Sequence, residues 1–225
     1  MGVLHKINKG NQIHNPTTIL IANPKGGSGK TTLATNLACL LANSGFKVKL
    51  WDLDPQKSSS KWLALRGDKF SKIEGMGEES EIKPNYDKSG RSGFVIIDSP
   101  AAMQSKTLKR ALKLAKKVVI PVQPSMFDLT AVDGFINALA VEARNRNDND
   151  FFGMVGMRVD ARTRTAATLR LFLEQYNVPI LTYIKDTQMY ANAAFSGLGL
   201  CDLSPSMKEE EERKWRLLLE WIAKD

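Results

Sequence analysis

The sequence has few of the residues that build common catalytic and structural centres. Its only two histidines, His5 and His14, lie among the first 16 of 225 residues, which argues against a serine–histidine triad or a histidine zinc site in the folded body. Its only two cysteines, Cys39 and Cys201, supply neither a disulfide framework nor a metal quartet, as is typical of a reducing compartment. No apolar run approaches the roughly 20 residues that cross a bilayer, and the first residues lack the apolar stretch of a signal peptide. We therefore expect a cytoplasmic protein.

Positive charge is in excess. Lys plus Arg is 32 and Asp plus Glu is 24, so the formal net charge is +8, while 43% of the residues are apolar. This composition is that of an ordinary folded protein, and the length suits one domain with a sizeable core.

Short apolar runs alternate with longer helical stretches from Thr17 onward. This alternation predicts an α/β fold, with one domain over residues 17–225 and a mostly parallel sheet covered by helices on both faces. Residues 1–16 lack periodicity and are interpreted as a flexible tail, and the stretch 67–92 receives no assignment. The expected strands are 18–22, 47–51, 94–97, 118–122, 152–157 and 180–184. The expected helices are 31–44, 58–65, 106–117, 129–145, 164–176, one from about 189, and 205–223.

The glycine-rich segment NPKGGSGKTT, residues 23–32, separates the first expected strand from the first expected helix. Its glycines let the backbone curl so that N–H groups face an anion, and the helix adds the positive end of its dipole. Lys30 can reach the β- and γ-phosphates of a nucleotide, and the Thr31 hydroxyl can bind magnesium. The expected phosphate-binding residues are Lys25, Gly26, Gly27, Ser28, Gly29, Lys30, Thr31 and Thr32.

This segment departs from the common phosphate-loop pattern. Pro24 stands where the common motif has its first glycine, and a second lysine, Lys25, precedes the double glycine. In these features the loop resembles the deviant Walker A loop of the ParA/MinD class of ATPases, with the short ParA partition proteins most similar. The resemblance implies a P-loop ATPase that uses ATP and Mg²⁺. It also implies that Lys25 reaches across an ATP-dependent homodimer to the partner's nucleotide.

Two aspartates follow the second expected strand in the sequence WDLDPQ, residues 51–56. Side chains two apart on a strand share a face, so Asp52 and Asp54 are expected together at the carboxyl edge of the sheet, where such folds bind ligands. Pro55 lacks an N–H and would end the strand there. The resemblance implies that Asp54 positions or activates the attacking water and that Asp52 supports the site.

A third aspartate, Asp98, closes the apolar run 94–97. Apolar residues followed by Asp form the Walker B pattern, which holds magnesium beside the loop threonine, so Thr31 and Asp98 are the expected magnesium residues. The segment 99–105 resembles the family's second switch. Positioning and charge stabilisation carry most of phosphoryl transfer, so hydrolysis is expected to be slow until a partner completes the site.

Two groups of basic residues suit contact with DNA phosphates. The resemblance, which extends over most of residues 17–205, implies nonspecific DNA binding, association with the nucleoid, and a ParB-like or other adaptor protein that stimulates hydrolysis. It implies positioning of a cargo, which could be a plasmid, a chromosome region or a protein assembly. The first basic group is Lys106, Lys109, Arg110, Lys113, Lys116 and Lys117, and the second is Arg158, Arg162, Arg164 and Arg170.

Two alternatives stay open. MinD-like proteins end in an amphipathic membrane anchor, and Trp215, Leu218 and Ile222 recur at helical spacing near the end of this chain. Such anchors have cationic polar faces, whereas residues 206–225 carry slightly more acids than bases, so we expect this helix to pack on the core without a membrane. A metallochaperone or reductase of the same fold would pair cysteines, but Cys39 and Cys201 are far apart in the sequence.

Overall fold

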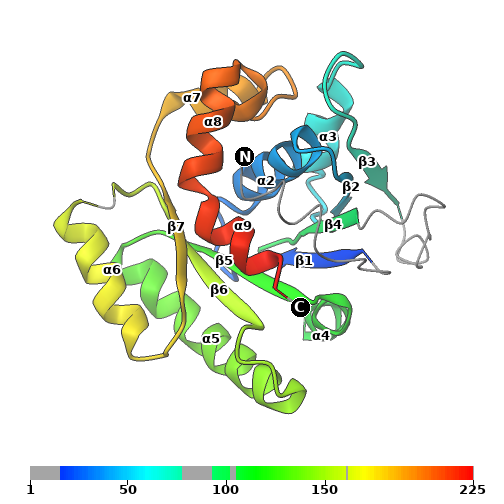
Figure 1. Cartoon of the computed structure of the whole chain (residues 1–225). Helices are drawn as coiled ribbons and strands as arrows, with labels where there is room; N and C mark the ends of the chain where they lie inside the picture. The colour runs from blue at the N-terminus through cyan, green and yellow to red at the C-terminus, as the bar shows by residue number, and fades with distance from the viewer. Residues whose placement is uncertain (1–15, 78–92, 102–104, 161, 225) are drawn as a thin grey trace.

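The computed structural model describes residues 16–77, 93–101, 105–160 and 162–224. Within these ranges lie seven strands and eight α-helices (Figure 1). The expected tail, residues 1–16, falls almost wholly outside them. The strands are β1 Thr17–Ile21, β2 Lys47–Asp52, β3 Glu74–Met76, β4 Gly93–Asp98, β5 Lys117–Val122, β6 Phe152–Met157 and β7 Ile180–Ile184. The helices are α2 Lys30–Asn43, α3 Ser58–Leu65, α4 Ser105–Leu114, α5 Met126–Arg146, α6 Arg164–Glu174, α7 Gln188–Ala194, α8 Pro205–Lys214 and α9 Arg216–Ile222, with a 3₁₀ turn, η2, at Leu200–Asp202.

The seven strands form one sheet in the order β3-β2-β4-β1-β5-β6-β7, and every described pair is parallel. The strand β1 therefore lies near the centre, between β4 and β5. Asp98 at the end of β4 is in register with both Ile21 of β1 and Asp52 of β2. The carboxyl ends of three neighbouring strands thus meet at one edge, which is where ligands bind in open parallel sheets.

Helices cover both faces of this sheet, as the unbroken apolar runs of its strands require (Figure 1). Ile19 and Ile21 pack in the layer that contains α2, α3 and α9, and Leu20 packs in the opposite layer, which contains α4, α5 and α6. Since all three side chains are fully buried, β1 has no solvent-facing side. The predicted fold class is confirmed. Of the described helices, none has the length and apolarity needed to cross a membrane.

Several element ends lie one to three residues from their predicted positions. Three differences have a clear physical cause. The edge strand β3 lies in a stretch left unassigned, because three residues with one apolar side chain carry no periodic signal. The helix expected over 106–117 ends at Leu114, since the following residues enter β5. The helix expected over 205–223 is two helices broken at Trp215. There the Thr182 hydroxyl donates to the Lys214 carbonyl at 2.6 Å, so a carbonyl near the break has a partner from β7.

Lys117 is not part of an exposed basic surface, contrary to expectation. It is the first residue of β5 and is only 1% exposed. Its Nζ donates to the Asp150 carbonyl at 3.0 Å and lies 5.1 Å from the centre of the Trp221 ring. Burial lowers the pKa of Lys117, and the nearby carboxylates of Asp148 and Asp150 oppose this. Lys117 is therefore removed from the first basic group of candidate DNA-binding residues.

We expect Trp215→Ala to lower the free energy of unfolding by about 3–5 kcal/mol, because Trp215 is 1% exposed and its removal leaves a cavity beneath the α8–α9 break. Leu217→Ala, two residues further on, is the control, since Leu217 is 55% exposed and its replacement should cost below about 1 kcal/mol. Urea unfolding monitored by circular dichroism measures both. Similar losses in the two variants would contradict the packing described.

Candidate nucleotide-binding site

The loop between β1 and α2 has the backbone conformation of an anion cradle. Gly27 and Gly29 have φ values of 73° and 93°, in the left-handed region that favours glycine. A Cβ at Gly29 would lie 2.6 Å from Cε of Met157, so the end of that flexible side chain would have to move. Gly29 is the N-cap residue of α2 and has no side chain to bond the first N–H groups of the helix. These donors and the positive end of the helix dipole are therefore directed at the loop.

The loop is held from the side by the end of β5. The Asn23 side chain donates to the Pro121 carbonyl at 2.7 Å and accepts from the Lys25 N–H at 2.8 Å. The Gln123 side chain donates to the Gly27 carbonyl at 2.7 Å. Residues that are about 100 positions apart in the sequence thus set the backbone of the expected phosphate site.

Lys30 lies inside the cradle and is 7% exposed. Its Nζ donates to the Lys25 carbonyl at 2.9 Å and, at 3.4 Å, to the Ser28 hydroxyl. Burial lowers the pKa of Lys30, while the negative charges of Asp98 and Asp54 oppose that shift. The carbonyls and carboxylates around the ammonium group therefore offset only part of the cost of burying its charge, and a bound phosphate would add further negative charge beside it.

Lys25 makes an ion pair within its own subunit. Its Nζ lies 2.8 Å from Oδ2 of Asp128, in the first turn of α5. The sequence-based interpretation assigned Lys25 to the nucleotide of a partner and did not single out Asp128. The only local signal for Asp128 is its position three residues after Ser125, which caps α5. That pattern predicts a helix start but not a contact with a loop 103 positions away.

Asp52 and Asp54 both lie at the carboxyl edge, with different surroundings. The strand β2 ends at Asp52, so the alternation of side chains does not extend to Asp54. The buried Asp52 carboxylate accepts from the N–H groups of Asp54 at 3.0 Å and Ser60 at 2.8 Å. It therefore shapes the turn and the start of α3. Asp54 is half-buried, and one of its oxygens accepts from the Gln56 N–H at 2.8 Å.

Asp98 is fully buried, and neither carboxylate oxygen has a hydrogen-bond partner in the described part of the chain. Burial raises its pKa from 3.8 to about 6, and the nearby hydroxyls of Ser59 and Thr31 oppose that rise. Ser59 is also fully buried with an unpartnered hydroxyl, and the sequence offered no signal for it. A buried, unpartnered carboxylate beside hydroxyl groups matches the oxygen-rich surroundings that Mg²⁺ prefers.

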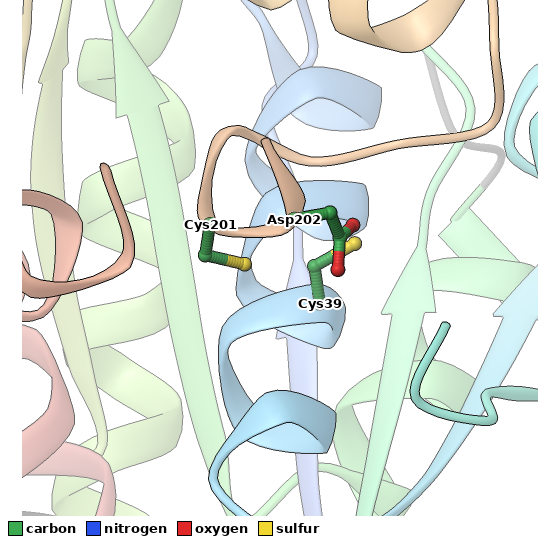
Figure 2. A group of neighbouring side chains, drawn as sticks. All are labelled: Cys39, Cys201 and Asp202. Carbon is green, nitrogen blue, oxygen red and sulfur yellow. The ribbon is translucent and has the colours of Figure 1, made fainter. Parts of the chain in front are cut away.

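The two cysteines come together in space, which their separation in the sequence did not suggest. Cys39 of α2, Cys201 and Asp202 place their ligand atoms within 4.8 Å of one another (Figure 2). The Asp202 oxygens, however, already accept from Arg66 at 2.7 and 3.0 Å and from Asn43 at 2.6 Å. Burial alone would raise the pKa of Asp202, but these bonds lower it. We interpret the cluster as a buried ion pair lined by thiols, because its carboxylate has no free acceptor for a metal.

We expect Asp98→Asn to raise the free energy of unfolding of the metal-free and nucleotide-free protein near neutral pH. The folded-state pKa of Asp98, about 6, exceeds the ordinary 3.8, so folding disfavours the ionised form. This destabilisation is present above about pH 7 and disappears as the pH falls through 6 toward 4. It amounts to at most about 3 kcal/mol.

Urea unfolding with a chelator, at about pH 7.5 and about pH 4, measures the difference between the variant and the parent at each pH. Asp68→Asn is the control, because Asp68 is exposed and should change little at either pH. A loss of stability at neutral pH in Asp98→Asn would contradict the expectation.

Comparisons with known proteins also indicate a nucleotide-binding domain. Residues 19–200 match the model of the CobQ/CobB/MinD/ParA nucleotide binding domain. The chain is 28% identical over 216 residues to the maintenance of carboxysome distribution protein A of Gloeobacter kilaueensis, which covers 93% of this chain and 95% of that protein. It is 30% identical over 179 residues to the chromosome-partitioning ATPase Soj of Thermus thermophilus, which covers 66% of this chain and 72% of that protein.

The same fold occurs in solved structures. An ATP complex of a McdA variant from Cyanothece has a TM-score of 0.67 and 18% identity, and the match covers 91% of this chain and 96% of that one. The resemblance inferred from the loop at residues 23–32 is confirmed, and the chain belongs to the CobQ/CobB/MinD/ParA family of nucleotide-binding domains.

Proposed function

We propose that this protein is a ParA-type ATPase that dimerises on ATP, binds DNA without sequence preference and positions a cargo, with an adaptor protein stimulating hydrolysis. One observation carries the proposal. At the edge where β1, β2 and β4 end, a glycine-shaped cradle, a buried lysine and a buried unpartnered aspartate lie together. A nucleoside triphosphate with its metal supplies the charges that complete this arrangement.

Thr31 and Asp98 would hold magnesium, and the ion would neutralise negative charge on the phosphates. The chain's own groups bind and orient the triphosphate. The α2 N–H groups and Lys30 contact its oxygens, and the left-handed turn at Gly29 keeps the loop close to them. Electrostatic stabilisation of this kind, rather than a strong base, is the main requirement of phosphoryl transfer.

Asp54 is the proposed residue that orients the attacking water. It is half-buried at the carboxyl edge, and its negative charge acts on Lys30. Asp52 supports it, because the Asp52 carboxylate binds the Asp54 N–H at 3.0 Å. In the dimer, Lys25 is proposed to contact the partner's nucleotide.

The α4 helix is the proposed DNA-binding surface. Lys106, Lys109 and Lys113 are exposed on it, while Ala111 and Leu112 are buried on its core side. In the second basic group, by contrast, charge is partly neutralised. Arg162 lies 3.0 Å from Asp160, and its hydrogen bonds lower the pKa of that carboxyl. The helix α4 also follows the segment expected to sense the nucleotide, which would link DNA binding to ATP.

The cargo remains one of the three classes inferred from the sequence. The similar proteins named above act, by their names, on carboxysome distribution and on chromosome partitioning. A protein assembly and a chromosome region are thus both represented among relatives. Co-purification from the native host, with ATP present, would identify the adaptor and through it the cargo.

A MinD-like membrane cycle is the second candidate, and the structure does not favour it. Except for Leu217, which is 55% exposed, the apolar side chains of α9 lie in the core, with Leu218, Leu219 and Ile222 at most 2% exposed. An amphipathic anchor would need these side chains for lipid. Liposome flotation that depends on ATP and on residues 206–225 would favour the MinD-like cycle instead.

We expect three variants to separate binding, dimerisation and hydrolysis. Lys30→Ala should lose tight ATP binding. Lys25→Ala should keep ATP but fail to dimerise, because its ammonium group is proposed to act in trans. Asp54→Ala should dimerise with ATP and hydrolyse it about 10²-fold more slowly or worse, because the water is no longer oriented.

Fluorescent-nucleotide titration, sedimentation velocity and phosphate release measure the three steps. Lys61→Ala is the control, because Lys61 is exposed on α3 and has no assigned role. Equal hydrolysis rates in Asp54→Ala and the parent protein would count against the role given to Asp54.

We expect neutralising Lys106, Lys109 and Lys113 together to weaken ATP-dependent binding to random-sequence DNA. The slope of log K against log salt is negative, and each lost phosphate contact reduces its magnitude by about 0.9. The loss of three contacts should therefore reduce the magnitude by about 3. The matched control neutralises Lys61, Lys72 and Lys224, which are exposed elsewhere. Anisotropy titrations across salt concentrations measure the slopes. An equal decrease in the magnitude of the slope in the two triple variants would reject α4 as the binding surface.

A further inference from the structure

Ser59 has no part in the proposed function, although its hydroxyl is buried beside a proposed magnesium residue. We propose that Ser59 is a positioning residue whose hydroxyl orients the Asp98 carboxylate when magnesium and a nucleotide are bound. The proposal rests on the proposed function, because it concerns the carboxylate assigned there to the ion.

The hydroxyl of Ser59 is enclosed by the protein and still lacks a partner. Ser59 is 0% exposed, and its Oγ makes no hydrogen bond within the part of the chain that the structure describes. A buried hydroxyl without a partner costs free energy, and alanine at this position would avoid that cost. Such a group therefore needs an explanation, and a contact that forms only when a ligand binds is one.

The unpartnered hydroxyl lies beside an unpartnered carboxylate. Asp98 is also 0% exposed, and among the described residues neither of its oxygens is hydrogen-bonded. Burial raises the pKa of Asp98 to about 6, and the hydroxyls of Ser59 and Thr31, which lie close to it, oppose this rise. Thr31 is already proposed to bind the ion. Ser59 is thus the hydroxyl beside this carboxylate that has no role assigned to it.

Hydroxyl chemistry suits the task of orienting a carboxylate. A serine hydroxyl donates one hydrogen bond, and a donor on one carboxylate oxygen fixes the group while the other oxygen faces the ion. Mg²⁺ requires nearly ideal octahedral geometry, so its binding is sensitive to how such a carboxylate is turned. Residues that hold metal-site carboxylates in this way affect the affinity for the metal without touching it.

The backbone that carries Ser59 is fixed by the chain itself. Ser59 lies in the first turn of α3, where the N–H of the next residue, Ser60, donates to the Asp52 carboxylate at 2.8 Å. The same carboxylate accepts from the Asp54 N–H at 3.0 Å, and Asp52 is in register with Asp98 on the neighbouring strand. One carboxylate therefore ties the segment with the Ser59 hydroxyl to the turn with the proposed water-orienting residue. Ser59 is in place before any ligand binds.

The Mg²⁺ dependence of nucleotide binding tests this proposal. The probe is a fluorescent ADP, which is not hydrolysed, titrated in EDTA and across a range of Mg²⁺ concentrations. We expect Ser59→Ala to raise the Mg²⁺ concentration at half-saturation by about tenfold or more, because the loss of such an outer partner weakens metal binding by about 10- to 100-fold. The affinity for ADP in EDTA should not change, since the phosphate loop keeps all its contacts.

Ser60→Ala is the matched control. It is the same substitution one residue further on, at an exposed side chain, and it keeps the N–H that binds Asp52. Both measurements should equal those of the parent protein. The proposal is overturned if the Mg²⁺ dependence of Ser59→Ala is also unchanged, or if its affinity falls equally with and without Mg²⁺. Should Ser59→Ala not fold, by circular dichroism, Ser59→Cys carries the same expectation, because a thiol is only a weak donor.

A double variant shows whether Ser59 acts through Asp98. Two residues that act as one unit have non-additive effects. In the Asp98→Asn protein, Ser59→Ala should therefore raise the Mg²⁺ concentration at half-saturation by less than about twofold more. A further tenfold rise, as large as in the parent background, would show that Ser59 acts independently of Asp98 and would reject the positioning role.

The two proposals fail in different ways. A parent protein that does not bind ADP, or whose affinity for ADP is the same with and without Mg²⁺, would count against the proposed function and its magnesium residues. A parent protein with a clear Mg²⁺ dependence, together with a Ser59→Ala variant that behaves identically, would reject only the role of Ser59.

Discussion

A carboxylate buried without a hydrogen-bond partner is the constraint on which the rest of this site depends. Asp98 is fully buried at the end of a central strand, and this burial raises the pKa of its carboxyl. The surrounding sheet can hold such a residue because β1, β2 and β4 are neighbours in the sheet and are packed on both faces. The same burial makes an incoming cation strongly favoured, since little water competes for the carboxylate.

The lysines of the site are positive charges that are likewise constrained by their surroundings. Lys30 is buried among carbonyls and carboxylates, and Lys25 is tied to Asp128. In the single subunit each charge has a partner from its own chain. A nucleotide enters a site whose charges are already arranged, and its binding is in part an exchange of partners.

Much of the fold was predictable from local patterns. The strands at 152–157 and 180–184 and the helix at 58–65 have the predicted bounds. The prediction was wrong where the period persists but a tertiary contact intervenes. At Trp215, a buried indole and a hydroxyl from β7 divide a sequence that reads as one continuous helix. The edge strand β3 was not predicted, because three residues are too few to show a period in hydrophobicity.

The chain order of glycines, lysines and aspartates was enough to predict the nucleotide-binding family, because phosphate binding needs those residue types at those spacings. Contacts between distant segments could not be inferred in this way. The pairing of Lys25 with Asp128, the burial of Ser59 near Asp98 and the meeting of Cys39 with Cys201 all join elements that only the packing of the sheet brings together. A local pattern reports what a segment can do, whereas its partners depend on which helices and strands lie against it.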